Sequence, residues 1–197
     1  MSYKDFERQI GTRKTRDNIL IVCEGETEKF YLEKFSRHIK IINVKGGSAL
    51  TLVQRAVEEK NDPSKFYNKV WCVVDRDRGS NNPPENLIIA LELAQENKIQ
   101  LAYSNQCFEL WFLLHYEIPL IKLTKAQYIR KLSKFIGEKY KKPAEEMHGL
   151  LKKLKPQALR NAGQLYDRYS GEDWLENDPY TRVHLLVEEI EEYLKGY

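Results

Sequence analysis

Residues 70–79 read VWCVVDRDRG, an apolar run that ends abruptly in two aspartates, each followed by an arginine. Valine-rich runs of this length are typical of a strand that is buried on both faces, so we expect a strand over 69–75. A buried strand has no structural need to end in the charged residues at 75–78. The stretch therefore predicts an internal strand and, at its carboxyl end, a charged segment that requires a chemical explanation.

The first half of the chain alternates strand and helix patterns on both sides of this run. Short apolar runs rich in β-branched residues are separated by stretches with helical spacing, such as SALTLVQRAVEEK at 48–60. Near-continuous apolar strands with helices between them predict an α/β fold, with a parallel sheet of about four strands flanked by helices. The expected strands cover residues 18–23, 39–47, 69–75 and 99–104.

The second half of the chain becomes mostly helical after residue 105. CFELWFLLHYE (107–117) is apolar nearly all round, which predicts a packed helix, and four further helical patterns follow, punctuated by prolines. We therefore expect a basic N-terminal segment at 1–17, an α/β core at 18–105 and a helical C-terminal cap at 106–197 that packs on the core.

The composition is that of a soluble globular protein, with 42% hydrophobic and 31% charged residues in a chain of 197. No apolar run is long enough to span a bilayer, and the N-terminal segment lacks the apolar centre of a signal peptide. We therefore expect a cytoplasmic protein without a membrane partner. Cys23, Cys72 and Cys107 form no CxxC pair, so they are expected to be core residues rather than zinc ligands or disulfides.

Charge is distributed unevenly along the chain. The net charge is only +3, yet residues 120–160 hold twelve Lys or Arg against three Glu. A basic region of this kind can attract a polyanion such as nucleic acid by releasing its counterions. The alternative is a solvated helical face, which is common for lysine-rich helices.

Polar residues stand at the carboxyl ends of three expected strands, where ligands bind in open α/β sheets. They are Glu24, the pair Gly46-Gly47, and Asp75 with Asp77. Alternate residues of an extended chain point the same way, so the two aspartates can face one point. Paired carboxylates repel unless a cation neutralises them, and hard oxygen ligands suit Mg²⁺ or Mn²⁺. Alternatively, one aspartate caps the next helix or pairs with a neighbouring arginine.

Glu24 favours the metal interpretation. If the first and third strands are adjacent, Glu24 stands beside Asp75. The alternative is that Glu24, Glu26 or Glu28 complements the positive N-terminus of the following helix. Glu26 and Glu28 fit that alternative well, whereas Glu24, still on the strand side of Gly25, fits it less well.

The segment SNQCFELWFLLH at 104–115 follows the fourth expected strand. Ser104 and Asn105 begin it at the rim where ligands are expected, which makes them candidate substrate-binding residues. Asn105 and Glu109 are four apart on an expected helix and can face the same side. Glu109 is costly to bury without a partner. It is therefore a candidate catalytic residue, as an added metal ligand or by orienting an arginine or His115, or else half of a structural pair that holds the cap.

The stretches ILIVCEGETEKFYL, VWCVVDRDRG and SNQCFELWFLLH together resemble the RloB family, whose core is similar to the Toprim domain. The resemblance extends from GGSALTLVQRAVE to NDPYTRVHLLVEEI and so covers most of the chain. It implies a strand-end glutamate and a later DxD that bind Mg²⁺ for phosphodiester chemistry. Those positions are Glu24, Asp75 and Asp77. It also implies an effector of phage defence by abortive infection, often encoded beside an ATPase.

The function expected from this resemblance is that of a metal-dependent nuclease, similar to OLD-type Toprim nucleases. Mg²⁺ or Mn²⁺ would be held by Glu24, Asp75 and Asp77, with Glu24 as an alternative general base or acid. Arg76 and Arg78 would steady the phosphate charge.

Two alternatives stay open at this point. In the first, the same rim holds Mg²⁺ and a phosphorylated ligand, or docks an ATPase partner, without cleavage. In the second, the protein is a structural subunit, and the carboxylates at this rim only form salt bridges with Arg76 and Arg78. The choice between DNA, RNA and tRNA as substrate stays open too, as does the oligomeric state, a homodimer included.

Overall fold

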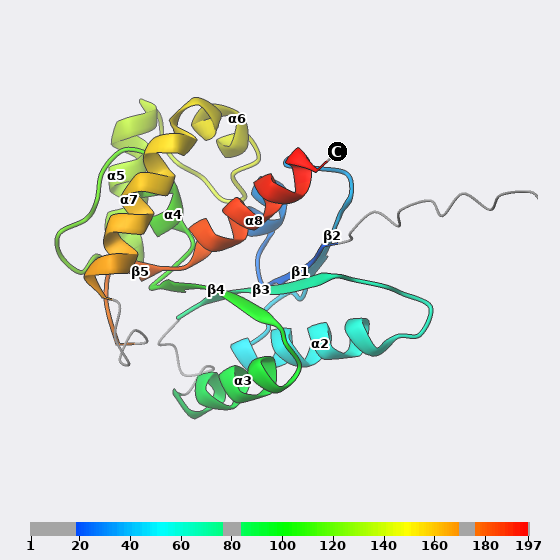
Figure 1. The fold of residues 1–197 in the computed structure, drawn as a ribbon. Coiled ribbons are helices and arrows are strands. Elements are labelled where there is room, and N and C mark those ends of the chain that lie inside the picture. Colours follow the sequence, from blue (N-terminus) through cyan, green and yellow to red (C-terminus); the bar gives the residue numbers. More distant parts are fainter. Residues whose placement is uncertain (1–18, 77–83, 170–175, 197) are drawn as a thin grey trace, which may run out of the picture.

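The computed structural model describes residues 19–76, 84–169 and 176–196. Its centre is a five-stranded sheet in the order β2-β1-β3-β4-β5 (Figure 1). The first four strands run parallel, and β5 pairs antiparallel with β4. The expected α/β architecture is confirmed, with one strand more than expected. The strands are β1 (Ile19–Cys23), β2 (Ile39–Asn43), β3 (Lys69–Asp75), β4 (Gln100–Asn105) and β5 (Tyr180–Thr181).

Helices cover both faces of the sheet. In Figure 1, α2 and α3 lie against one face, and the remaining helices lie on the side of the other face. The helices are α1 (Glu26–Glu33), α2 (Ala49–Asn61), α3 (Pro84–Glu96), α4 (Glu109–Leu113), α5 (Lys125–Ile136), α6 (Met147–Leu151), the 3₁₀ helix η1 (Lys152–Leu154), α7 (Lys155–Arg168) and α8 (Val183–Lys195).

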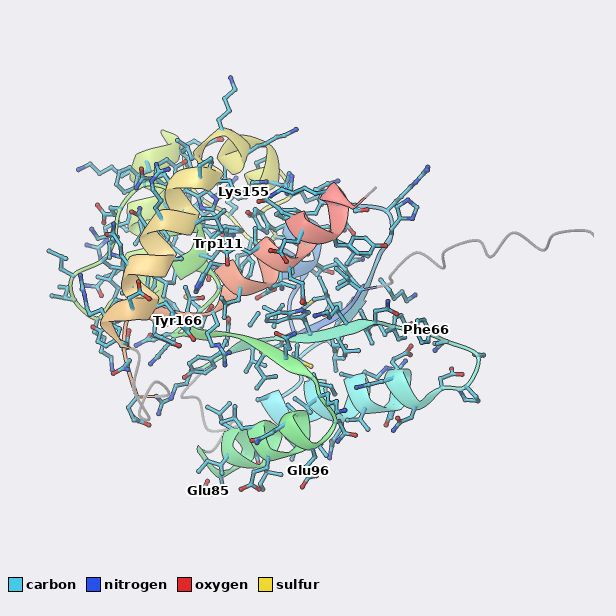
Figure 2. The ribbon with its side chains drawn as sticks, viewed as in Figure 1. Phe66, Glu85, Glu96, Trp111, Lys155 and Tyr166 are labelled. Carbon is cyan, nitrogen blue, oxygen red and sulfur yellow. The ribbon has the colours of Figure 1, made fainter. Side chains whose placement is uncertain are left out.

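The alternation of side chains along β3 explains why its sequence is apolar without a break. Val70, Cys72 and Val74 belong to the core between the sheet and helices α2 and α3. Trp71 and Val73 point the other way, into the core beneath the remaining helices. Because both faces are covered, every position from 70 to 74 is buried. Figure 2 shows side chains filling the space between the sheet and its helix layers.

In addition to the expected helices, the C-terminal region contributes a strand to the sheet. β5 extends the sheet beyond β4, with Thr181 opposite Ser104. Helix α8 packs on the sheet, since Val187 and Ile190 share a core cluster with Trp71. A strand of two residues has no period that the sequence could reveal, which is why β5 was not expected.

The start of the helix after β4 differs from the expectation. Asn105 and Glu109 were expected on one helix, but Asn105 ends β4 and Glu109 begins α4. The chain stays extended at Asn105 because that residue pairs with Tyr180 of β5. Asn105 and Glu109 therefore do not share a helix face.

Two smaller expectations can be compared with the structure. Cys23, Cys72 and Cys107 are buried and free, as expected for core residues. No helix among the described residues combines the length and the apolar character needed to cross a bilayer.

Candidate active site

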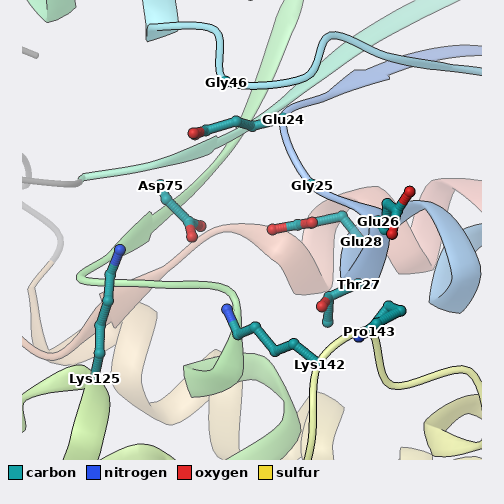
Figure 3. Close-up of a pocket in the computed structure, with 10 residues that line it drawn as sticks. All are labelled: Glu24, Gly25, Glu26, Thr27, Glu28, Gly46, Asp75, Lys125, Lys142 and Pro143. Carbon is teal, nitrogen blue, oxygen red and sulfur yellow. The ribbon is translucent and has the colours of Figure 1, made fainter. Parts of the chain in front are cut away.

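A cavity of about 350 Å³ lies at the carboxyl ends of β1 and β3. These strands are neighbours, with Cys23 level with Val73, so the residues that follow them meet at one place. The expected adjacency of the first and third strands is thus confirmed. Figure 3 shows acidic and basic side chains converging on this space. The lining residues are Glu24, Gly25, Glu26, Thr27, Glu28, Gly46, Asp75, Lys125, Lys142 and Pro143.

Asp75, the last residue of β3, turns its carboxylate into the cavity (Figure 3). Its Oδ1 atom is buried and has no hydrogen-bond partner within the described residues. Burial raises the pKa of Asp75 well above its ordinary value, and the charges of Glu28 and Glu109 raise it further, while Lys142 and Lys125 oppose the shift. A carboxyl group in this environment retains a proton, or accepts another cation, more readily than an exposed one.

Glu24 follows β1 directly and lines the same cavity, as the sequence predicts. It is partly buried, and its carboxylate lies on the sheet side of the space in Figure 3. The structure therefore brings these two candidate residues from separate strands to one rim.

Glu28 is a site residue that the sequence reasoning missed. It was expected to complement the N-terminus of its helix, but its side chain is only 7% exposed and points toward Asp75. Its Oε2 atom is buried without a hydrogen-bond partner within the described residues. Burial raises the pKa of Glu28 and the charge of Glu109 adds to that shift, while a hydrogen bond from its own backbone amide opposes it. The available signal was helical spacing, since Glu28 precedes the buried Tyr31 and Leu32 by three and four residues.

Gly25 makes room for Glu28. A Cβ atom added to Gly25 would overlap the Glu28 carboxylate. The backbone of Gly25 is extended, with φ −113° and ψ 164°, which any residue can adopt. A larger residue here would therefore displace the Glu28 carboxylate rather than strain the backbone.

Glu109 lies behind the cavity, at the start of α4. It is 1% exposed, and its Oε1 atom accepts a hydrogen bond from the Tyr140 hydroxyl at 3.1 Å. The ammonium group of Lys142 lies 2.6 Å from the same oxygen. Glu109 is thus paired with Lys142 and Tyr140, whereas the His115 ring faces the carbonyl of Trp111.

Two lysines complete the cavity wall, and the sequence indicated them only through the basic character of residues 120–160. Lys125 is the first residue of α5, whose N-terminus is fixed by a capping box formed by Thr124 and Gln127. Lys142 lies in the loop after α5. Burial lowers the pKa of Lys142, but Glu109, together with smaller effects of Asp75 and Glu28, raises it, and the net shift is upward. The lysine therefore keeps its charge.

Ser104 and Asn105 are both fully buried, and their side chains bond to the C-terminal region. The hydroxyl groups of Ser104 and Thr181 lie 2.9 Å apart. The Asn105 amide donates to the carbonyl of Asn177 at 2.7 Å, and its Oδ1 atom is buried without a partner in the described part of the chain. These contacts hold the edge of β4 against the segment that leads into β5.

The structure describes only the first two residues of the DRDR segment at 75–78. Arg76 pairs with Glu176, with Nη2 and Oε1 2.5 Å apart, and does not line the cavity. Asp77 and Arg78 lie outside the described residues.

The donor set can be compared with what a divalent cation needs. The cavity offers carboxylate oxygens, the ligands that Mg²⁺ and Mn²⁺ prefer, and two of them are buried without a partner. Within residues 19–76, 84–169 and 176–196, however, no group of three His, Cys, Asp or Glu side chains lies close enough to hold a metal ion. The described residues therefore provide oxygen ligands of the right chemistry but not a complete set.

Residues 19–190 match a protein-family model whose description is RloB-like protein. Searches of curated proteins and of solved structures returned no significant match.

Proposed function

The chain belongs to the RloB-like family, and from this premise we propose that it is a divalent-metal-dependent nuclease with a Toprim-like core. The substrate is nucleic acid, and the reaction is phosphodiester hydrolysis. The observation that carries the proposal is the pair of partner-less buried oxygens, on Asp75 and Glu28, in a cavity that also contains two lysines.

Buried acidic groups of this kind are costly to keep charged without a compensating cation. If these carboxylates were purely structural, we would expect a neighbouring cation to neutralise each of them, as Lys142 neutralises Glu109. The oxygens of Asp75 and Glu28 instead remain directed into the cavity without such a partner among the described residues. This arrangement is typical of a site that is completed by a ligand.

In the proposed mechanism, Glu24, Asp75 and Asp77 would hold Mg²⁺ or Mn²⁺, and Glu28 would add a carboxylate on the opposite side of the cavity. The metal ion would polarise the scissile phosphate and lower the pKa of the attacking water. Glu24 would accept or return a proton at its carboxylate.

Four further residues are proposed on the substrate side. Arg76, which pairs with Glu176 outside the cavity lining, and Arg78 would counter the phosphate charge, and Ser104 and Asn105 would shape the end of β4 beside the site. The lysine-rich region 120–160 supplies charge for the nucleic-acid backbone. The biological setting that we propose is abortive infection in phage defence, in a complex with an ATPase.

The alternative function is a binding module that holds a cation and a phosphate group, or docks the ATPase, without cleavage. It is favoured by the absence of a three-ligand group among the described side chains. The two functions differ in one measurable respect. Chelation abolishes turnover in a nuclease, whereas in a binding module it only weakens binding.

The deciding experiment is incubation of the protein with labelled DNA and RNA substrates in Mn²⁺, Mg²⁺ or chelator, with and without the ATPase. Asp75→Asn, Asp77→Asn and Glu24→Gln are each expected to abolish cleavage. Glu92→Gln, which alters an exposed carboxylate on α3, serves as the matched control. Cleavage that survives Asp75→Asn or chelation would exclude the proposed mechanism.

A further inference from the structure

The position of Lys142 is unusual for one half of an ion pair. Its partner Glu109 has a side chain that is 2% exposed, yet the Lys142 side chain is 48% exposed and lines the cavity. The charge of the pair is therefore divided between a buried carboxylate behind the wall and an ammonium group at its surface. Figure 3 shows that ammonium group pointing toward Asp75 and Glu28.

The loop that carries Lys142 is anchored on both sides of it. Tyr140 and Ala144 are buried, and the Tyr140 amide donates to the Ser133 hydroxyl at 3.0 Å. Tyr140 also reaches the oxygen of Glu109 that Lys142 contacts. The backbone on either side of Lys142 is thus fixed by packing, and its head group is fixed by Glu109.

Lys142 can donate more hydrogen bonds than its ion pair with Glu109 requires. An ammonium group donates three hydrogen bonds. Within the described residues, Glu109 is the one ion-pair or hydrogen-bond partner of Lys142 Nζ. A lysine kept only to neutralise Glu109 would need no contact with the cavity, whereas this one leaves donors available on the cavity side.

We propose that Lys142 is an anion-binding residue of the cavity and that it contacts a phosphate group of the ligand. The ligand class that fits is one with a phosphate flanked by a cation, because the same space has lysines on one part of its wall and carboxylates on another. This inference rests on the proposed function for its place in catalysis, but phosphate binding can be tested without cleavage.

The test uses inorganic phosphate as the probe, in chelator, with Asp75→Asn in every protein. That substitution removes both a proposed metal ligand and a charge that repels phosphate, so neither metal binding nor cleavage affects the readout. Binding is measured by calorimetry at constant ionic strength. Adding Lys142→Met is expected to weaken phosphate binding about tenfold or more, the value of one charge-assisted hydrogen bond. Lys142→Arg is expected to retain binding, and Lys40→Met, which alters an exposed lysine on β2 outside both the cavity lining and region 120–160, to leave it unchanged.

A second comparison addresses folding, because Lys142→Met leaves the Glu109 charge buried and unpaired. The same titration is repeated with Glu109→Gln in both proteins, so that they differ only in the ammonium group. Equal phosphate affinity with and without Lys142 in either folded pair would overturn the inference, as would no measurable binding to Asp75→Asn itself. Failure of the proposed nuclease is a separate result, since it would appear as no cleavage by the unaltered protein.

Discussion

Asp75 and Glu28 face each other across the cavity, and each has one buried oxygen without a hydrogen-bond partner within the described residues. One comes from the end of a strand and the other from the first turn of a helix. Two acidic groups in this position destabilise the fold when both are charged, because Lys142 and Lys125 only partly offset their burial and mutual repulsion. If the site binds a cation, as we propose, it trades stability for ligand binding.

The first prediction is that Asp75→Asn and Glu28→Gln each stabilise the metal-free protein. Each substitution removes a buried charge while keeping the side-chain volume, and we expect a gain of about 1–2 kcal/mol, or a few degrees in Tm. Thermal melts in chelator check this, with Glu92→Gln as the exposed control. A lower Tm for both variants would show that the two carboxylates are structural.

The second prediction concerns Gly25→Ala. The added methyl group displaces the Glu28 carboxylate, so Mn²⁺ affinity is expected to fall several-fold, measured by calorimetry, while the fold is retained. Gly163→Ala on α7 is the matched control, because a Cβ there meets nothing within 4 Å. That control is expected to gain about 0.5–1 kcal/mol in stability from the helix propensity of alanine. Unchanged Mn²⁺ affinity in Gly25→Ala would exclude Glu28 from the metal site.

The third prediction concerns the bond between Ser104 and Thr181. Removing either hydroxyl is expected to cost about 1 kcal/mol of unfolding free energy, because both side chains are fully buried. A double-mutant cycle of Ser104→Ala and Thr181→Val, measured by urea unfolding, is expected to give a coupling energy of at least about 0.5 kcal/mol. Additive effects together with reduced nucleic-acid affinity in Ser104→Ala would instead assign the hydroxyl to substrate binding.

The fourth prediction is a loss of stability in acid that depends on His184. Burial lowers the pKa of His184 to about 4, with Arg182 lowering it further and Asp167 opposing the shift. The folded state therefore binds this proton more weakly than the unfolded state, whose histidine titrates near 6.5. The contribution of His184 to stability is present above about pH 6.5 and is lost as the pH falls toward 4.

Urea unfolding of the wild type and His184→Gln from pH 7.5 to pH 4.5 checks this. The free-energy difference between the two proteins is expected to fall by roughly 2–3 kcal/mol over that range, since one proton is linked to unfolding over about two pH units. A constant difference would show that the imidazole titrates normally in the folded protein.

The apolar pattern of the sequence was sufficient for the central fold. VWCVV and ILIVC are apolar at every position because both faces of each strand are covered, and this local property predicts a parallel sheet without further information. The adjacency of β1 and β3 then brings Glu24 and Asp75 to one rim, as the sequence indicated.

Glu28, Lys142 and β5 required the tertiary structure. Glu28 has the composition and position of an ordinary first-turn acidic residue, and only the packing of α1 against the sheet turns it toward Asp75. Lys142 is one of twelve basic residues in 120–160, and only the anchoring of its loop by Tyr140 and Glu109 separates it from the others. The sequence by itself determined what is buried and which strands end in carboxylates, because those properties are local. The tertiary structure decided which charges meet, because that depends on contacts between residues that are far apart in the chain.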